Sequence, residues 1–330
     1  MEGQYDRADV FPSLDGEVLR QALIDEYRPN SVLSYGVARD IIFGEIDIVN
    51  DSLTCVYTGL QIYLDPALDP TETAFDQDIN TEHTFPRSKG ADDFTFGYSD
   101  MHHLYPTRVG ANSARASLPL LEVNDNAADA WYIGSTTQSN IPTSNIDDYS
   151  EYQQNVAFEP REDHKGNVAR SYFYFYTMYQ LDADIADPEF FEQQRETMCQ
   201  WHDADPVDRA EWNRSKNISV HQGNENPFVL DCRLSRLYCD SISSACLSVS
   251  VDPAPEQHTI NLISTGDILK VDGHSTGSTL YLYSTAGQLM AESDLPSDTA
   301  LVNIGDLPRG LYFAVVKDTT GSAQSFKIVR

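Results

Sequence analysis

The sequence predicts an α+β protein in two parts: a mixed region of helices and strands over residues 1–250 and a small all-β sandwich over 259–330. Three observations lead to this prediction. The chain has 330 residues, more than one domain usually holds, and 41% of them are hydrophobic, enough for a sizeable core. All the motifs that could carry chemistry lie before residue 232. The stretch SVDPAPEQH (250–258) then interrupts every regular pattern, and we expect a linker at 251–258.

The first informative segment is NTEHTFPRS at 80–88. Successive side chains of a strand point to opposite faces, so Glu82 and His83 can share one site only if the strand ends or bulges there. Pro86 favours an end, because proline cannot donate to a central strand ladder. We therefore expect a strand that ends at the Glu82–His83 pair.

A second polar cluster, SDMHHLYPTRVGANSAR, follows at 99–115. A neutral imidazole can take a proton from water near neutral pH, and carboxylate and amide oxygens suit a hard divalent cation that keeps several waters. Glu82, His83 and Asn112 together therefore predict a phosphodiesterase site. Zinc fits less well, since HExxH and CxxC pairs are absent. An isolated Glu–His pair is more often a surface feature, and the second cluster is what outweighs that alternative.

Around these residues we expect a helix from Asn112 toward Leu120, limited by Pro119. Of the adjacent His102 and His103, we expect one to pack beneath the site or to bond a backbone carbonyl.

The later segments predict scaffold. Arg170 has two interpretations, a contact to phosphate or a pair with an acid. Asp205, before Pro206, is the expected N-terminal cap of a helix, and QGNENPF (222–228) predicts a rigid loop. A helix buried on a wide face, rather than a stacking platform for bases, is predicted by aromatic residues at three- and four-residue steps, namely Tyr172, Phe173, Phe175, Tyr176 and Tyr179.

Beyond the expected linker, short β-rich segments alternate with Gly, Pro, Asp and Ser turns, which predicts a small antiparallel sandwich. These segments are TINLIS, DILKVDG, STLYLYSTAG, TALVNIGDL, RGLYFAVVKD and SFKIVR.

Six segments taken in order resemble the bacterial endonuclease I family. They are EHTFPRS, SDMHHLYPT, NSAR, FEPREDHKGNVARSYFYFYTMY (158–179), WHDADPVDRAEWNR (201–214) and HQGNENPFVLD (221–231). The segment at 35–60 is similar to the family's N-terminal helix and first strand, so the resemblance covers roughly residues 30–232. Family members are secreted or periplasmic nucleases of the His-Me finger superfamily. The resemblance thus implies a ββα-metal core with surrounding helices.

The resemblance also implies roles for particular residues. His83 would be the general base that deprotonates the attacking water. Glu82 and Asn112 would hold one Mg²⁺, with other divalent cations as alternatives, and cleavage would leave a 5′-phosphate. We include Arg115, the arginine of the same NxxR motif, among the catalytic candidates.

The chain departs from the family at one point. Some family members carry a phosphate-binding arginine in a longer insertion between the two histidine motifs, whereas here that interval holds only Arg87 and Lys89. Arg87 and Lys89 are therefore candidates for binding substrate phosphate. Arg170 is a third candidate, through its first interpretation above.

The tail resembles the C-terminal sorting domain of cargo for the type IX secretion system of Bacteroidetes-type bacteria. LYLYSTAGQLM, IGDLPRGLYFAVV and the basic ending FKIVR carry that resemblance. It implies secretion machinery as a partner and a secreted or cell-surface protein. A generic β-sandwich accessory module is the alternative. Met1-Glu2-Gly3-Gln4 has no basic n-region or apolar h-region, so we expect a processed form with an added Met1 or a misassigned start. No apolar run is long enough to span a membrane.

Cys199, Cys232, Cys239 and Cys246 could form one or two disulfides of undefined connectivity, and Cys55 makes the count odd.

The net charge is −29, and residues 1–252 hold 43 acidic residues against 17 basic ones. A region with this charge should repel nucleic acid phosphates unless cations screen the repulsion. We therefore expect a salt-rich habitat, where such screening is strong. The motif region is locally more basic, which predicts a positive groove within an acidic shell; its basic residues are Arg87, Lys89, Arg108, Arg115, Arg161, Lys165 and Arg170.

These observations favour a secreted, metal-dependent, largely sequence-nonspecific endonuclease acting on DNA, with RNA as a second substrate class, as a monomer. Two alternatives remain open. One is a secreted binding or adhesion protein with an inactive nuclease-like core. The other is a phosphodiesterase for extracellular small molecules, which would need a closed pocket.

Overall fold

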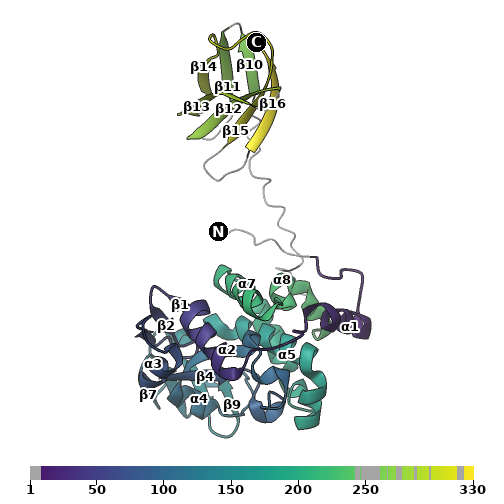
Figure 1. Cartoon of the computed structure of the whole chain (residues 1–330). Coiled ribbons are helices and arrows are strands. Elements are labelled where there is room, and N and C mark those ends of the chain that lie inside the picture. The colour runs from purple at the N-terminus through teal and green to yellow at the C-terminus, as the bar shows by residue number, and fades with distance from the viewer. Residues whose placement is uncertain are drawn as a thin grey trace. The chain divides into compact units, whose positions relative to one another are not determined.

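The computed structural model describes residues 9–241, 246, 261–265, 267–272, 277–285, 288–296, 299–317 and 323–330. The chain divides into two compact units, residues 1–249 and 250–330. Figure 1 shows helices and short strands in the first and only strands in the second. The expected linker at 251–258 lies outside the described residues.

The first unit combines helices with small antiparallel sheets. Its helices are α1 (Gly16–Tyr27), α2 (Tyr35–Ile41), α3 (Pro70–Asp76), α4 (Val109–Arg115), α5 (Lys165–Ala186), α6 (Glu192–Ala204), α7 (Arg209–Gln222) and α8 (Pro227–Leu230). Its strands are β1 (Ile48–Val49), β2 (Ser52–Thr54), β3 (Gln61–Tyr63), β4 (Ile79–His83), β5 (Leu104–Arg108), β6 (Ala130–Ile133), β7 (Thr136–Gln138), β8 (Ser150–Gln153) and β9 (Ala157–Glu159). They form the sheets β1-β2-β3, β4-β5 and β7-β6-β8-β9.

The pair β4-β5 and the helix that follows it form the part of the fold that holds both polar motifs. The strands run antiparallel, with Glu82 opposite Tyr105 and His83 opposite Leu104. The prediction that the strand ends at the Glu82–His83 pair is confirmed, since β4 stops at His83. α4 begins at Val109, immediately after β5. One antiparallel pair and one helix thus bring the two motifs together.

The predicted range of this helix was wrong. It covers Val109–Arg115 instead of running from Asn112 toward Leu120. It ends because Ala116 adopts φ 48° and ψ −115°, a conformation that cannot continue a right-handed helix. Pro119 therefore lies beyond the helix and does not end it.

The helix predicted from the aromatic spacing is confirmed as α5, and it lies at the centre of the first unit's core. Tyr172, Phe173 and Phe175 are fully buried. Phe85, which follows β4, stacks on Phe175 with ring centroids 4.3 Å apart. The core therefore extends directly beneath the segment that carries Glu82 and His83.

The predicted helix cap at Asp205 was wrong. Asp208 caps α7 instead, accepting a hydrogen bond from the backbone N–H of Glu211 at 2.7 Å. Asp205 lies after α6 and accepts from the backbone N–H of Gly166 at 2.8 Å, so it joins the start of α5 to the end of α6. In the predicted loop 222–228, Gly223 has φ 85° and Asn226 caps α8.

Two disulfides form among the four clustered cysteines, Cys199–Cys239 and Cys232–Cys246. Cys55 is free and buried. Its Sγ accepts from the backbone N–H of Arg108 at 3.0 Å, so it contributes to the packing of β5.

The second unit consists of two antiparallel sheets, β10-β11-β14 and β13-β12-β15-β16. A single apolar core is shared between them, with Leu269 and Val271 from one sheet and Leu280, Leu282 and Val316 from the other. This confirms an all-β region of antiparallel sheets. The strand β13, between two predicted segments, was not foreseen. The strand bounds are β10 (Asn261–Thr265), β11 (Ile268–Asp272), β12 (Ser278–Ser284), β13 (Leu289–Leu295), β14 (Thr299–Asn303), β15 (Leu311–Lys317) and β16 (Ala323–Val329).

None of the helices in the described part of the chain is both long and apolar enough to span a membrane.

Candidate active site

Glu82 is buried, and one of its two carboxylate oxygens is bound by neighbouring side chains. Its side chain is 2% exposed, and Oε1 accepts from the Tyr57 hydroxyl at 2.9 Å and pairs with Arg115 Nη1 at 3.1 Å. Burial raises the pKa of this carboxyl, opposed by the guanidinium of Arg115 and the hydroxyl of Tyr57. Oε2 has no hydrogen-bond partner among the described residues, so one carboxylate oxygen is left for a ligand.

His83 is oriented by a backbone carbonyl. Its Nε2 lies 3.0 Å from the carbonyl oxygen of Tyr98, and because a carbonyl can only accept, Nε2 carries the proton. Nδ1 makes no hydrogen bond among the described residues and keeps its lone pair. Burial lowers the pKa of His83 to about 3, so the ring is neutral at pH 7. The rings of Tyr35 and Tyr98 pack against it at centroid distances of 5.3 and 5.4 Å.

Asn112 projects from α4 toward β4. Its Nδ2 donates to Asn80 Oδ1 at 2.8 Å and to the Thr81 carbonyl at 3.1 Å. These two bonds fix the amide, and Oδ1 has no hydrogen-bond partner within the described chain. Since Thr81 precedes Glu82, the free oxygens of Asn112 and Glu82 belong to adjoining parts of one site.

Arg115 ties the helix to the strand. It is 1% exposed, and besides Glu82 it donates to the His83 carbonyl at 3.0 Å and to the Tyr172 hydroxyl at 3.0 Å. Its charge is therefore directed at Glu82 and the backbone. We assign it a positioning role, because a guanidinium so enclosed does not face a substrate.

The three residues proposed to bind phosphate lie in different settings. Arg87 is 54% exposed, pairs with Asp93 and lies 5.0 Å from the centroid of the Tyr98 ring. Lys89 pairs with Asp187 at 2.7 Å. Arg170 is buried, and its guanidinium binds both oxygens of Glu211 at 2.7 Å, so it pairs with an acid and does not reach solvent.

Both histidines of the MHH segment are buried and bond carbonyls, as expected of one of them. His102 Nε2 lies 2.9 Å from the Asn224 carbonyl. His103 Nε2 is hydrogen-bonded to the Gly97 carbonyl, and its ring lies 5.6 Å from that of His83.

The donor set suits a hard cation. Glu82 Oε2 and Asn112 Oδ1 are oxygen ligands, which fits a divalent ion such as Mg²⁺ that keeps several of its waters. Within the described ranges no group of three or more His, Cys, Asp or Glu side chains could hold a metal. Glu82 and Asn112 would offer two protein oxygens, and water would complete the coordination of such an ion.

Sequence reasoning missed the residues that orient the site. Tyr57, Tyr98 and Tyr35 lie outside the two motifs, and no local pattern links them to Glu82 or His83. Asn80 could have been found: it lies two residues before Glu82 on the same strand, and alternate residues of a strand share a face.

Two curated nucleases are similar to nearly half of this chain. An extracellular ribonuclease of Bacillus subtilis (strain 168) is 32% identical over 168 residues, which cover 46% of this chain and 51% of the relative. An extracellular deoxyribonuclease of Aeromonas hydrophila is 29% identical over 139 residues, covering 42% and 52%. The chain spans about half the length of the curated relatives it matches.

A solved immunoglobulin-like β-sandwich of Bacteroides vulgatus covers 23% of this chain and 87% of its own, at 18% identity and a TM-score of 0.21, too weak a likeness to define a fold. The family model described as Endonuclease I matches residues 46–232, which is more than half of the chain and includes Glu82, His83, Asn112 and Arg115. This chain therefore belongs to the endonuclease I family.

Proposed function

We propose that the protein is a secreted, metal-dependent endonuclease that hydrolyses phosphodiester bonds of DNA, with RNA as a second substrate class, and that β4, β5 and α4 form its ββα-metal core. One observation carries the proposal. The strand pair and the helix gather a neutral imidazole with a free Nδ1 and two uncommitted hard oxygens, on Glu82 and Asn112. A general base beside a divalent-cation site is the equipment needed for phosphodiester hydrolysis.

In this mechanism His83 Nδ1 takes the proton of the attacking water, while the Tyr98 carbonyl holds Nε2–H and thus the orientation of the ring. Glu82 Oε2 and Asn112 Oδ1 would hold the cation, which when bound supplies charge stabilisation at the phosphate and the departing 3′-oxygen. Arg115 and Tyr57 keep Glu82 in place. Cleavage at the 3′-oxygen leaves a 5′-phosphate.

We infer the substrate from the named relatives, and the location from the disulfides and the tail motifs. The two relatives compared above are named extracellular ribonuclease and extracellular deoxyribonuclease, which supports nucleic acid of either kind as substrate. Two disulfides favour an oxidising compartment. We assign the second unit to export through a type IX secretion system, on the tail motifs given above.

The decisive experiment incubates the full chain with plasmid DNA and, separately, with RNA, in Mg²⁺ and in chelator. The wild-type protein should cut only when the metal is present. His83→Ala should lower the rate by about 10²–10⁴-fold, because it removes the base, and should leave binding of DNA in chelator nearly unchanged.

His221→Ala is the matched control, because His221 lies on α7 and its ion-pair partner is Glu45, which is not a candidate site residue. Retention of more than a tenth of the wild-type rate by His83→Ala would remove His83 from the role of base.

A further inference from the structure

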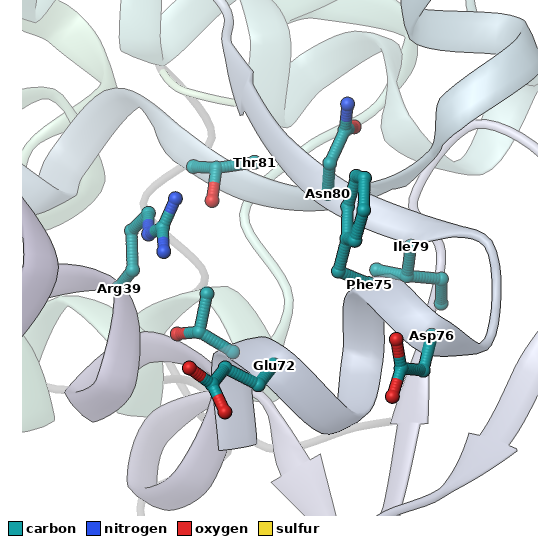
Figure 2. A pocket seen from close by; sticks show the side chains of 8 residues that line it. Arg39, Glu72, Phe75, Asp76, Ile79, Asn80 and Thr81 are labelled. Carbon is teal, nitrogen blue, oxygen red and sulfur yellow. The ribbon is translucent and has the colours of Figure 1, made fainter. Parts of the chain in front are cut away.

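A pocket of about 320 Å³ is lined by three residues of β4, the strand that ends in Glu82 and His83. Arg39 of α2, Glu72, Phe75 and Asp76 of α3, and Asn80 and Thr81 of β4 are among the residues that line it, as Figure 2 shows. The pocket shares its β4 wall with the active site: Thr81 precedes Glu82, and Asn80 Oδ1 accepts the hydrogen bond that fixes Asn112. A ligand that continues from the reacting phosphate along this wall would enter the pocket.

Arg39 supplies a positive charge that contacts the Tyr35 side chain but has no carboxylate partner among the described residues. It forms no ion pair with any described residue, and its Nε is buried without a hydrogen bond. Its guanidinium lies 5.0 Å from the ring centroid of Tyr35, the residue that packs against His83. By contrast, Arg87 and Lys89 each have a carboxylate partner. Arg39 is thus available to an anionic group close to the site.

Phe75 supplies an exposed aromatic ring. It is 62% exposed although it is a large apolar side chain. Figure 2 places it across the pocket from Arg39, with Asn80 beside it. Glu72 and Asp76 also line the pocket, and Arg39 is the one positively charged residue of its lining, so a phosphate is favoured only near Arg39. Arg39 at one side suits an anionic group, and Phe75 at the other suits a flat ring. A nucleotide carries both, as its phosphate and its base.

We propose that this pocket binds the nucleotide next to the scissile phosphate, with its phosphate on Arg39 and its base stacked on Phe75. The inference rests on the proposed nuclease function and adds a subsite to it. Arg39 contributes to binding of the ground state and the transition state alike, so it lowers KM without raising kcat.

The test uses the full chain carrying His83→Ala, in chelator, with a fluorescein-labelled single-stranded DNA hexamer. Adding Arg39→Gln should weaken binding about tenfold and reduce the slope of log K against log salt by about 0.7, the value for one lost phosphate contact. Adding Phe75→Ala should weaken binding about fivefold or more without changing that slope. On an abasic hexamer, Phe75→Ala should not change the affinity, while Arg39→Gln should still weaken binding about tenfold.

Three further variants guard against trivial explanations. Phe75→Tyr keeps a stacking ring and should bind like the parent, and Arg39→Lys should retain the salt slope. Arg28→Gln is the matched charge control, because Arg28 is exposed, forms no ion pair with a described residue and packs over Tyr179.

The outcomes separate this inference from the function itself. If the wild type cleaves DNA but the Arg39 and Phe75 variants bind like their parent, the pocket is not a subsite and the nuclease function stands. If the binding differences hold but the wild type cleaves neither DNA nor RNA with any divalent metal, the subsite stands and the nuclease function fails. In the active protein, a fall in kcat on Arg39→Gln with unchanged affinity would place Arg39 on the scissile phosphate and overturn the subsite.

Discussion

At the scale of single residues, burial controls the charge of the histidines. It lowers the pKa of His83, His164 and His202 to about 3 and that of His103 to about 4. In the unfolded chain the same rings take up a proton below about pH 6.5. Between pH 6.5 and these folded pKa values the unfolded state therefore binds more protons, so each buried histidine makes folding less favourable as the pH falls.

His202 allows this effect to be measured away from the candidate site. We expect His202→Gln to make the free energy of unfolding less sensitive to acid, by about 1.4 kcal/mol per pH unit between pH 6 and pH 4. Chemical denaturation of variant and wild type at several pH values measures the difference. The comparison is needed because Glu151 and Glu159, whose pKa values burial raises to about 8 and 7, change stability with pH in the opposite direction. Parallel stability curves for the two proteins would show that His202 does not resist protonation in the folded state.

The two oxygen donors make a second test at this scale. Glu82→Ala and Asn112→Ala should each weaken the apparent affinity for Mg²⁺ in an activity titration, because both supply oxygen to the same ion. Their combined effect should be smaller than the product of the single effects, since the two groups act as a unit. An unchanged Mg²⁺ affinity in either variant would remove that residue from the metal site.

At the scale of elements, the sequence predicted the features that depend on neighbouring residues in the chain. The end of β4 at His83 and the buried helix α5 followed from proline chemistry and aromatic spacing. The failures depended on tertiary partners. Asp205 suits a helix cap by its local sequence, but the backbone of Gly166 binds it, and the cap passes to Asp208. Arg115, a catalytic candidate from its motif, pairs with Glu82 and donates to the carbonyl of His83, and no local pattern indicated these contacts. The sequence led us to propose Glu82, His83 and Asn112 as the reacting groups, but no local pattern pointed to the tyrosines that orient Glu82 and His83.

The end of α4 makes a prediction about stability. Ala116 has φ 48°, where an alanine side chain is strained and glycine is not. Ala116→Gly should therefore raise the free energy of unfolding by about 1 kcal/mol. Ala114→Gly, two residues earlier within the helix, should lower it by about 1 kcal/mol, because glycine is a poor helix former. Urea denaturation compares the two, and a loss of stability in both would place Ala116 inside a continuing helix.

At the scale of the whole molecule, the site belongs to one unit. Residues 9–241 contain the whole candidate site and a core of their own, and every motif of the site lies before residue 232. We expect residues 1–250, expressed alone, to fold and to cut nucleic acid at a rate similar to that of the full chain. A truncated protein that is folded but inactive would reveal a role of the second unit in catalysis or substrate binding.

The acidic surface and the ion pairs lead to an expected dependence on salt. The basic residues around the motifs were expected to form a positive groove, but each has a carboxylate partner, so little positive charge is free at low salt. The pairs are Arg87–Asp93, Lys89–Asp187, Arg108–Asp78, Arg115–Glu82, Arg161–Asp163, Lys165–Glu159 and Arg170–Glu211.

Two effects of salt on activity therefore oppose each other. Rising salt weakens contacts to phosphate, because releasing counterions into a more concentrated salt solution gains less free energy. It also screens repulsion by the acidic body and loosens exposed pairs such as Arg87–Asp93, as the Debye length falls from about 10 Å at 0.1 M to about 3 Å at 1 M. Cleavage at fixed Mg²⁺ should therefore pass through a maximum at elevated sodium chloride. Asp93→Asn, which frees Arg87, should move that maximum to lower salt, whereas Arg87→Gln should reduce activity most on the low-salt side. A rate that declines steadily from the lowest salt in the wild type would show that the acidic surface lies away from the bound nucleic acid, and would withdraw the expected adaptation to a salt-rich habitat.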